Sequence, residues 1–174
     1  MTAKDFIKAV SNGEADIIQM LLDIIARIDT PYCIIGGLAV NAYADPVVSL
    51  DLDIVIVARR LEELCAKAVE AGFTIERFEH SINLSSPKSD LRVQLQTDAR
   101  YQEFISRSQR KHVLGYELMV ATMEDVLKGK LWAYMDQARR KSKRQKDLAD
   151  ITRLVETHPD LLKFLPDDVK TKIE

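Results

Sequence analysis

The chain has 174 residues, 47% of them hydrophobic and 30% charged, which is the composition of one folded domain or of a small core with a helical appendage. These values exclude a largely disordered chain, a collagen-like repeat and a miniprotein held together by disulfides. The 25 Lys and Arg residues against 27 Asp and Glu give a formal net charge of -2, so nucleic-acid binding would have to come from a local basic patch.

The first residues and the two cysteines predict a cytoplasmic protein with no membrane partner. The N-terminus has no basic stretch followed by a long apolar region, so we expect no signal peptide. The longest apolar runs fall short of the roughly 20 residues that span a bilayer. Cys33 and Cys65 lie in apolar surroundings without C-x-x-C spacing, which favours buried thiols in a reducing compartment.

The first part of the chain is predicted to be helical, and the middle to be rich in strands. Apolar residues recur every three to four positions over residues 3–28, and Ser11-Asn12-Gly13 is expected to break this helix. From Tyr32 the pattern predicts a strand over 32–35, a helix over 38–44, a strand over 50–57, a helix over 59–71, strands over 73–78, 82–84 and 91–97, and a turn at 85–89.

The rest of the chain is predicted to be mainly helical. We expect a helix over 99–108 capped by Asp98, a short strand within 112–121, a helix over 123–138 capped by Thr122, a helix through residues 148–155 and a short terminal helix from Pro166. Strands in the middle and helices at both ends predict an α+β fold with a C-terminal helical tail.

The stretch from Ile34 to Val57 contains the candidate catalytic and ligand-binding residues. A predicted strand meets Gly36 and Gly37 before a helix, and glycines at a helix N-terminus allow a phosphate to approach the backbone closely. Asp51 and Asp53 alternate along the next strand, so both carboxylates lie on one face with Cα atoms about 6.6–6.8 Å apart. Paired carboxylates suit Mg²⁺ (or Mn²⁺) together with the phosphates of a nucleotide.

Each half of this pattern has an ordinary alternative. A Gly-Gly pair after a strand is common, and two alternating aspartates can simply belong to a solvated strand face. The strand that follows Asp53 is very apolar, however, and ionised carboxylates on a central strand need a cation or a hydrogen-bond partner. The combination, in this order, therefore favours a metal–nucleotide site.

This arrangement resembles the signature of the DNA polymerase β-type nucleotidyltransferases, in which Gly-Gly or Gly-Ser is followed by Asp-hydrophobic-Asp. It is most similar to the small prokaryotic nucleotidyltransferase-like proteins, including those of abortive-infection and toxin–antitoxin systems. The Lys146-Asp147-x-x-Asp150 spacing resembles a feature of the helical tails of that family. The resemblance implies a mixed β-sheet flanked by helices, with an N-terminal helical segment (1–30), a catalytic core (31–121) and a C-terminal helical region (122–174).

The resemblance implies roles for individual residues. Asp51 and Asp53 would be catalytic and would hold the metal, while Gly36, Gly37, Ser49 and Lys130 would bind the nucleotide. Two departures from the family pattern stand out. The third acidic residue is replaced by Gln94, or by Gln96 if the strand register differs, with Asp90 or Asp98 as possible substitutes. Ser49 stands where relatives carry an arginine or a similar polar residue before the aspartates.

Six of the eight residues from Arg139 to Lys146 are basic. They form either a solvated surface or a clamp for a triphosphate or an RNA backbone. Lys130 is likewise either an exposed side chain or a triphosphate contact.

The sequence thus predicts a Mg²⁺-dependent nucleotidyltransferase that moves a nucleoside monophosphate from an NTP to a hydroxyl of an RNA, a protein or a small molecule. The alternative is a catalytically degenerate binding module, or a toxin–antitoxin component with a protein partner. The neutral amide of Gln94 motivates this alternative, because it is a poor Mg²⁺ ligand and cannot act as a general base.

Overall fold

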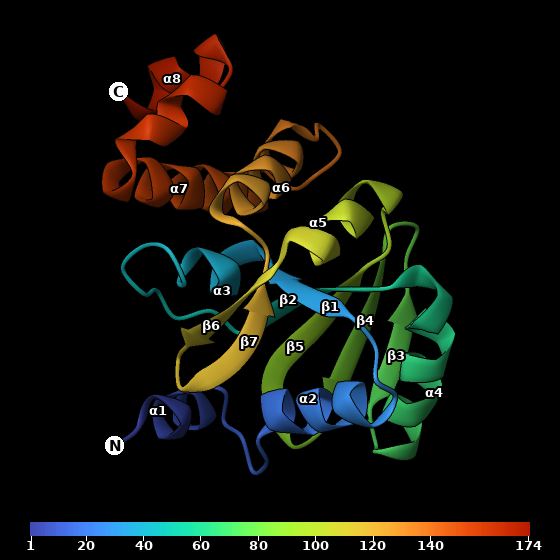
Figure 1. Ribbon diagram of the computed structural model, residues 1–174. Helices are drawn as coiled ribbons and strands as arrows, with labels where there is room; N and C mark the ends of the chain where they lie inside the picture. The colour runs from blue at the N-terminus through green and yellow to red at the C-terminus, as the bar shows by residue number, and fades with distance from the viewer.

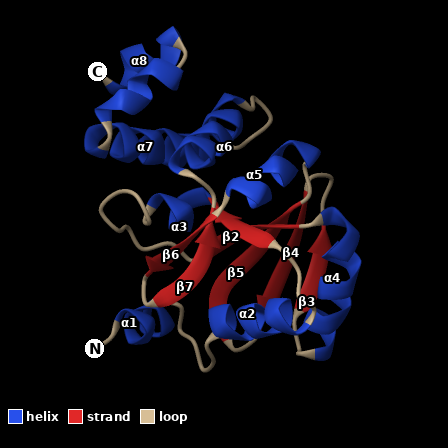
Figure 2. Cartoon of the chain, in the orientation of Figure 1, coloured by secondary structure: helices blue, strands red, loops and turns tan.

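The computed structural model describes residues 1–174, which form one seven-stranded sheet surrounded by helices (Figures 1 and 2). The strands are β1 (Tyr32–Ile35), β2 (Asp51–Ile56), β3 (Thr74–Arg77), β4 (Ser81–Ser86), β5 (Ser89–Gln96), β6 (Gln109–Val113) and β7 (Tyr116–Val120). The helices are α1 (Ala3–Val10), α2 (Ile17–Arg27), α3 (Gly36–Val40), α4 (Leu61–Glu70), α5 (Gln102–Arg107), α6 (Met123–Met135), α7 (Lys141–Thr157) and α8 (Asp167–Ile173).

The sheet is mixed, with the strand order β3-β4-β5-β2-β1-β7-β6. Strand β1 runs antiparallel to β2 and parallel to β7, and β2 runs parallel to β5. The carboxyl end of β1 therefore lies beside the first half of β2, with Ile35 opposite Asp53, and the carboxyl end of β7 lies on the other side of β1. Because α3 follows β1 and α6 follows β7, both helices start at this end of the sheet. The architecture confirms the predicted α+β class, with a mixed sheet flanked by helices and a helical C-terminal region.

Helices α2 and α4 lie next to each other, and α3 packs with α6 and α7 at the end of the sheet where β1 and β7 finish (Figure 1). The alternation of β2 is visible in its burial, since Leu52 and Ile54 are buried while Asp51 and Asp53 are half-buried. The buried side chains of the strands join those of the helices in one continuous core. Burial of this apolar set favours the register that leaves both aspartates on the opposite face.

Several predicted elements have different boundaries in the structure. The helix after β1 begins at Gly36, so the two glycines belong to its first turn. The predicted turn at 85–89 is shorter, because β4 continues to Ser86 and β5 begins at Ser89. The basic run was expected to precede a helix, but α7 already begins at Lys141 and includes most of it.

The region 112–121 was predicted to hold one short strand, and it forms a hairpin of β6 and β7 instead. The two connecting residues, Leu114 and Gly115, have positive φ values of 49° and 85°. Two-residue turns of this kind match the twist of the paired strands, and they usually carry Asn or Asp before Gly. Leucine at the first position hides the turn signal, which is why the sequence pattern suggested a single strand.

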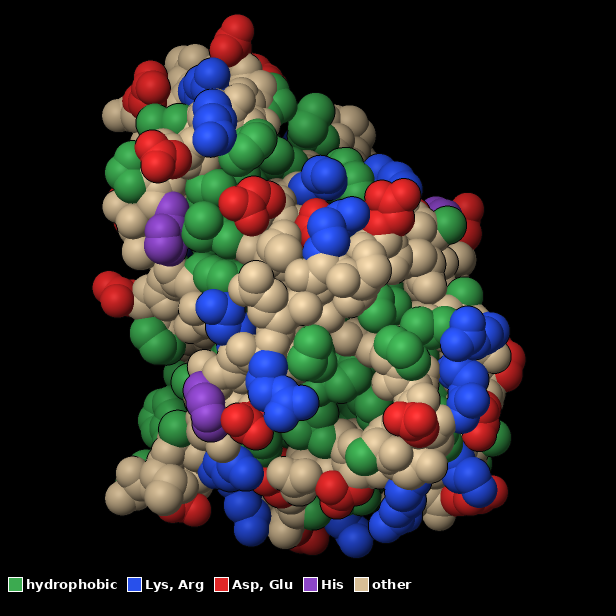
Figure 3. Space-filling view, viewed as in Figure 1, with side chains coloured by type: hydrophobic (Ala, Val, Ile, Leu, Met, Phe, Trp, Pro, Cys, Tyr) green, Lys and Arg blue, Asp and Glu red, His purple; other side chains and the backbone are tan.

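No helix is long and apolar enough to cross a membrane. On the face shown in Figure 3, basic and acidic side chains are interspersed, and hydrophobic side chains reach the surface near its centre. This face is therefore not a single-sign surface, as the near-neutral net charge already indicated.

Candidate active site

Asp51 and Asp53 lie at the start of β2, where β1 ends and α3 begins. Asp53 stands opposite Ile35, the last residue of β1, and the chain then turns through Gly36 with a φ of 71°. A Cβ atom on Gly36 would clash with the Asp53 carboxylate. Glycine is thus required here both by the positive φ and by the close approach of Asp53. Gly37 has more room, since a Cβ there would lie 3.7 Å from Asp150 Oδ2.

The carboxylate of Asp51 is held by two cations. Arg92 Nε lies 2.8 Å from Asp51 Oδ1, and Lys143 Nζ lies 3.5 Å from Asp51 Oδ2. Arg92 is the cross-strand neighbour of Asp51 on β5, whereas Lys143 reaches it from α7. Ser49 sits just before this strand, and its hydroxyl accepts a hydrogen bond from the Asp51 backbone N–H at 3.2 Å. In the structure Ser49 therefore supports the entry into β2.

The carboxylate of Asp53 has no hydrogen-bond or ion-pair partner, unlike that of Asp51. Burial raises the pKa of Asp53 to about 6, even though the positive charge of Lys130 opposes the shift. The nearby negative charge of Asp51 adds to the increase of this pKa. An ionised Asp53 would consequently be stabilised by any cation that entered the site.

Gln94 lies directly beside Asp53, as the expected strand register requires. Strand β5 pairs Arg92 with Asp51 and Gln94 with Asp53, so the amide occupies the position next to the second aspartate. Gln96 lies one alternate position further and accepts a hydrogen bond from the Asp98 backbone. Asp98 itself is paired with Arg100 at 2.8 Å, and neither it nor Asp90 lines the cavities around Asp53. The strand-end aspartates therefore do not supply a third carboxylate.

Lys130 forms a buried ion-pair network that the sequence reading did not anticipate. Its Nζ lies 3.1 Å from Asp147 Oδ1 and 2.8 Å from Asp150 Oδ2. Burial would lower the pKa of Lys130, but the two aspartates outweigh it and raise this pKa overall. Arg139 Nε also contacts Asp147, at 2.7 Å. The Lys-Asp-x-x-Asp spacing thus serves to join α6 and α7, although Lys130 still borders the cavity.

Two adjoining cavities meet at Asp51 and Asp53. The smaller, of about 140 Å³, extends toward Gln94, Gln96 and the Tyr101 ring. The larger, of about 570 Å³, opens over α7 and the loop before β2. Its charged lining consists of Arg92, Lys130, Arg139, Lys143, Lys146 and Arg153 together with Asp51, Asp53, Asp147 and Asp150. Six cations against four carboxylates favour an anionic ligand in the larger cavity.

Helix α7 divides the basic run between two sides. Lys143 and Lys146 line the larger cavity together with Arg139, which lies two residues before the first residue of the helix. Lys141 and Arg144 instead line a separate groove beside Tyr134, where Arg144 donates a hydrogen bond to the Tyr134 carbonyl at 2.7 Å. Only part of the run is therefore directed at the candidate site, because its residues point to different sides of the helix.

The residues present fit one divalent cation better than two. No group of three or more His, Cys, Asp or Glu side chains is arranged to hold a metal ion. Asp51 and Asp53 nevertheless offer two carboxylates on one face, and Mg²⁺ typically completes its shell with water and substrate phosphates. The unpartnered Asp53 carboxylate is consistent with such an ion. A third protein ligand would have to come from the amide of Gln94.

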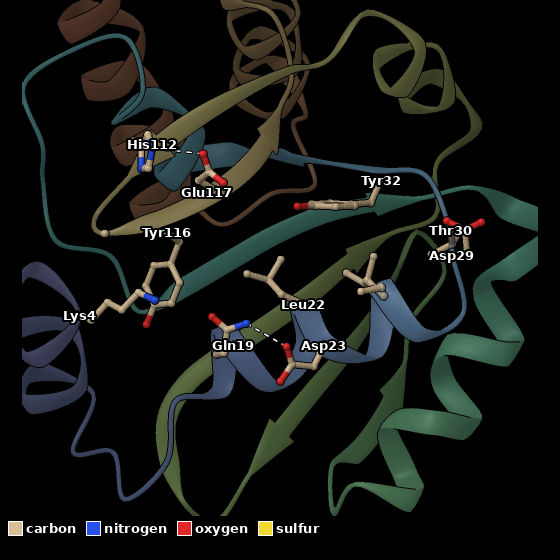
Figure 4. A pocket seen from close by; sticks show the side chains of 13 residues that line it. Lys4, Gln19, Leu22, Asp23, Asp29, Thr30, Tyr32, His112, Tyr116 and Glu117 are labelled. Carbon is tan, nitrogen blue, oxygen red and sulfur yellow. Dashed lines mark hydrogen bonds and ion pairs between the residues drawn. The ribbon is translucent and has the colours of Figure 1, made fainter.

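A further cavity of about 570 Å³ lies between α2 and the β6–β7 hairpin, away from the aspartates (Figure 4). Four of its polar side chains form two pairs. Gln19 donates a hydrogen bond to Asp23 at 2.9 Å, and His112 lies 3.3 Å from Glu117. Its carboxylates, Asp23, Asp29 and Glu117, are all exposed, unlike that of Asp53, so we place the candidate active site at the start of β2.

The structure brings every predicted site residue to the border of the same pair of cavities. Gly36, Gly37, Ser49, Asp51, Asp53, Gln94 and Lys130 each line at least one of the two. Sequence reasoning missed Arg92, Arg153 and the structural role of Asp147 and Asp150. The only sequence signal for Arg92 was its place two residues before Gln94, on the same strand face.

No protein-family model and no curated protein sequence matches the chain. Among solved structures, the chain is similar to the antibiotic-resistance factor ANT(2'')-Ia, with 14% identity, a TM-score of 0.61 and coverage of 90% of this chain and 86% of the other. It is also similar to the lincosamide antibiotic adenylyltransferase LnuA bound to lincomycin, with 12% identity, a TM-score of 0.56 and coverage of 79% and 95%. A nucleotidyltransferase-like protein from Paracoccidioides brasiliensis matches with 20% identity, a TM-score of 0.53 and coverage of 99% and 96%. At these identities the likeness establishes the fold, and the chain has a nucleotidyltransferase fold.

Proposed function

We propose that the protein is a Mg²⁺-dependent nucleotidyltransferase that moves a nucleoside monophosphate from an NTP to a hydroxyl acceptor. The observation that carries the proposal is the pair of carboxylates on one face of β2, next to Gly36 and beneath a cavity lined by six cationic side chains. The fold shared with nucleotidyltransferases supports it. The acceptor would be an RNA, a protein or a small molecule. The small-molecule class is the one represented by the antibiotic-bound neighbour LnuA.

In this reaction the acceptor oxygen forms a bond to the α-phosphorus, the bond from that phosphorus to the bridging oxygen breaks, and pyrophosphate leaves. Asp51 and Asp53 would hold the metal ion, which when bound polarises the phosphate oxygens. Arg139, Lys143 and Lys146 would bind the triphosphate in the larger cavity. The acceptor proton would pass to water in the cavity, because Asp51 and Asp53 are engaged with the metal and Gln94, the neighbour of Asp53 on β5, carries no carboxylate.

The side-by-side placement of Gln94 and Asp53 favours a second candidate function. An uncharged amide beside Asp53 provides neither a third metal ligand of the preferred type nor a base. A degenerate domain with this feature would bind nucleotide without turnover, or would act as a toxin–antitoxin component that associates with another protein. Native mass spectrometry of the protein from its own host tests the latter, and a monomer without any bound protein contradicts it.

The proposal is tested with α-³²P-labelled NTPs and Mg²⁺, following pyrophosphate release and label transfer. We expect Asp53→Asn to abolish transfer while leaving the fold intact. The control is Asp168→Asn, which removes the same charge. Asp168 is an exposed residue of α8 and lines neither of the two cavities. Full activity of Asp53→Asn contradicts the assignment. Nucleotide binding that depends on Asp53, but without turnover with any acceptor class, supports the degenerate module instead.

A further inference from the structure

Both oxygens of the Asp51 carboxylate are engaged by protein cations. Arg92 Nε lies 2.8 Å from Oδ1 and Lys143 Nζ lies 3.5 Å from Oδ2. We refer to Arg92 and Lys143 as the cation pair. A divalent ion that is to bind Asp51 must compete with these two charges. The neighbouring Asp53 carries no such partner, so the competition is confined to one of the two candidate metal ligands.

The positions of the cation pair follow from the fold. Arg92 stands opposite Asp51 in the parallel register of β2 and β5. Lys143 projects from α7 one turn before Asp147, and the contacts of Asp147 with Lys130 and Arg139 hold that turn in place. Both cations also line the larger cavity, where the phosphates of a nucleotide would lie. Each can therefore reach either the Asp51 carboxylate or a phosphate.

The exchange between these partners is energetically accessible. The Arg92 side chain is 62% exposed and Asp51 is 30% exposed, so solvent screens their ion pair. Exposed ion pairs contribute little to stability and are readily replaced. A triphosphate carries several negative charges and offers guanidinium and ammonium groups more anionic oxygens than one carboxylate does.

We propose that the cation pair binds Asp51 until phosphates arrive and then transfers to them, so that metal binding and polyphosphate binding depend on each other. This inference rests on the proposed function, because it assigns the order of events at the same site. Arg92 and Lys143 are then partners of Asp51 in the free protein and phosphate contacts in the complex. They keep Asp51 neutralised in the free protein, and they release it to the metal when the phosphates draw them away. By thermodynamic reciprocity, the metal must strengthen polyphosphate binding by the same factor.

The test uses Mn²⁺ alone and Mn²⁺-loaded inorganic tripolyphosphate as probes, because neither depends on the identity of the base. Calorimetry measures both affinities for wild type, Arg92→Gln and Arg92→Lys. Arg92→Gln should bind Mn²⁺ alone about fivefold more tightly, the factor that corresponds to one exposed ion pair. The same variant should bind the Mn²⁺–tripolyphosphate complex more weakly, and Arg92→Lys should restore the wild-type pattern.

Arg77→Gln is the matched control. Arg77 is an exposed arginine of β3 that forms an ion pair with Glu62 at 2.8 Å, so the variant removes the same charge away from the candidate site. An Arg92→Gln variant that binds Mn²⁺ alone no better than wild type overturns the inference, while binding of the Mn²⁺–tripolyphosphate complex by wild type would leave the proposed function standing. Failure of wild type to bind that complex overturns the proposed function, whatever the variant does with Mn²⁺ alone. Opposite changes in the two affinities support the inference.

Discussion

Replacing Lys130 by methionine tests whether this lysine serves the fold or the nucleotide. Its ammonium group lies between Asp147 and Asp150, and the exposed fractions of the three side chains are 10%, 2% and 16%. Removing one partner of a buried ion pair costs about 3–5 kcal/mol, because an uncompensated charge stays buried. Both aspartates keep a second cation, Arg139 and Arg153 respectively. We therefore expect a loss at the lower end, about 3 kcal/mol.

For a chain of this size, such a loss lowers the melting temperature by roughly 6–12 °C. Urea unfolding followed by circular dichroism measures the free-energy difference directly. The control is Lys128→Met on the same helix, because Lys128 is exposed and forms no ion pair, so only the surface charge changes. Lysine and methionine have similar helix propensities, which removes that difference from the comparison.

The reasoning is refuted if Lys130→Met unfolds at the same urea concentration as Lys128→Met. It is also refuted if Lys130→Met keeps its stability and loses tripolyphosphate binding, since Lys130 would then be a phosphate contact, as the sequence pattern suggested. A destabilised variant that still binds tripolyphosphate below its unfolding transition shows instead that the network joins α6 to α7.

Two further predictions concern Asp53 and its neighbour Gly36. Gly36→Ala should abolish Mn²⁺ binding and lower stability by at least about 1 kcal/mol, because it combines a positive φ with a clash against the Asp53 carboxylate. The control is Gly72→Ala, where φ is also positive but an added Cβ meets no atom within 4 Å. This variant should lose a similar amount of stability through backbone strain and keep Mn²⁺ binding. Equal Mn²⁺ affinities in the two variants would count against the clash. Folding raises the pKa of Asp53 from 3.8 to about 6, so the folded protein binds this proton more tightly than the unfolded chain does. The proton therefore contributes its full share to the free energy of unfolding below about pH 4. That contribution is lost as the pH rises through about 6. Asp53→Asn should therefore gain about 2–3 kcal/mol over wild type at pH 7 in the presence of EDTA but not at pH 4, and a pH-independent difference between the two urea curves would show that the Asp53 pKa is not raised.

The elements with strong local signals were predictable. The alternation of Asp51, Leu52, Asp53 and Ile54 defined a strand with one polar face, and the structure has this alternation in β2. Thr122 and Asp98 were recognised as caps, and both side chains accept hydrogen bonds from backbone N–H groups of the following turn. The hairpin of β6 and β7 was missed, because Leu114 occupies a positive-φ position that turn rules assign to other residues.

The candidate site was only partly predictable. Gly36, Asp51 and Asp53 are close in the chain, so a motif could carry them. The register of β5 against β2, which places Gln94 beside Asp53 and Arg92 beside Asp51, depends on hydrogen bonds between segments about 40 residues apart. The sequence left Gln94 and Gln96 as alternatives, because the side-chain period of two allowed either to lie on the face of the aspartates.

What the sequence determined by itself is the α+β class and the placement of Asp51 and Asp53 on one face of a strand, because both follow from short-range periodicity and spacing. The particular fold was implied by the resemblance of the glycine–aspartate motif. What only the tertiary structure decided is the pairing of charges. The resemblance implied that Lys130 binds the nucleotide, with an exposed side chain as the alternative, yet packing of α6 on α7 buries it between Asp147 and Asp150. Arg92, which no motif singled out, and Lys143, which the sequence marked only as part of the basic run, meet at Asp51 from two elements. The partner of a charge depends on which surfaces pack together, and that information lies in the whole chain rather than in any local pattern.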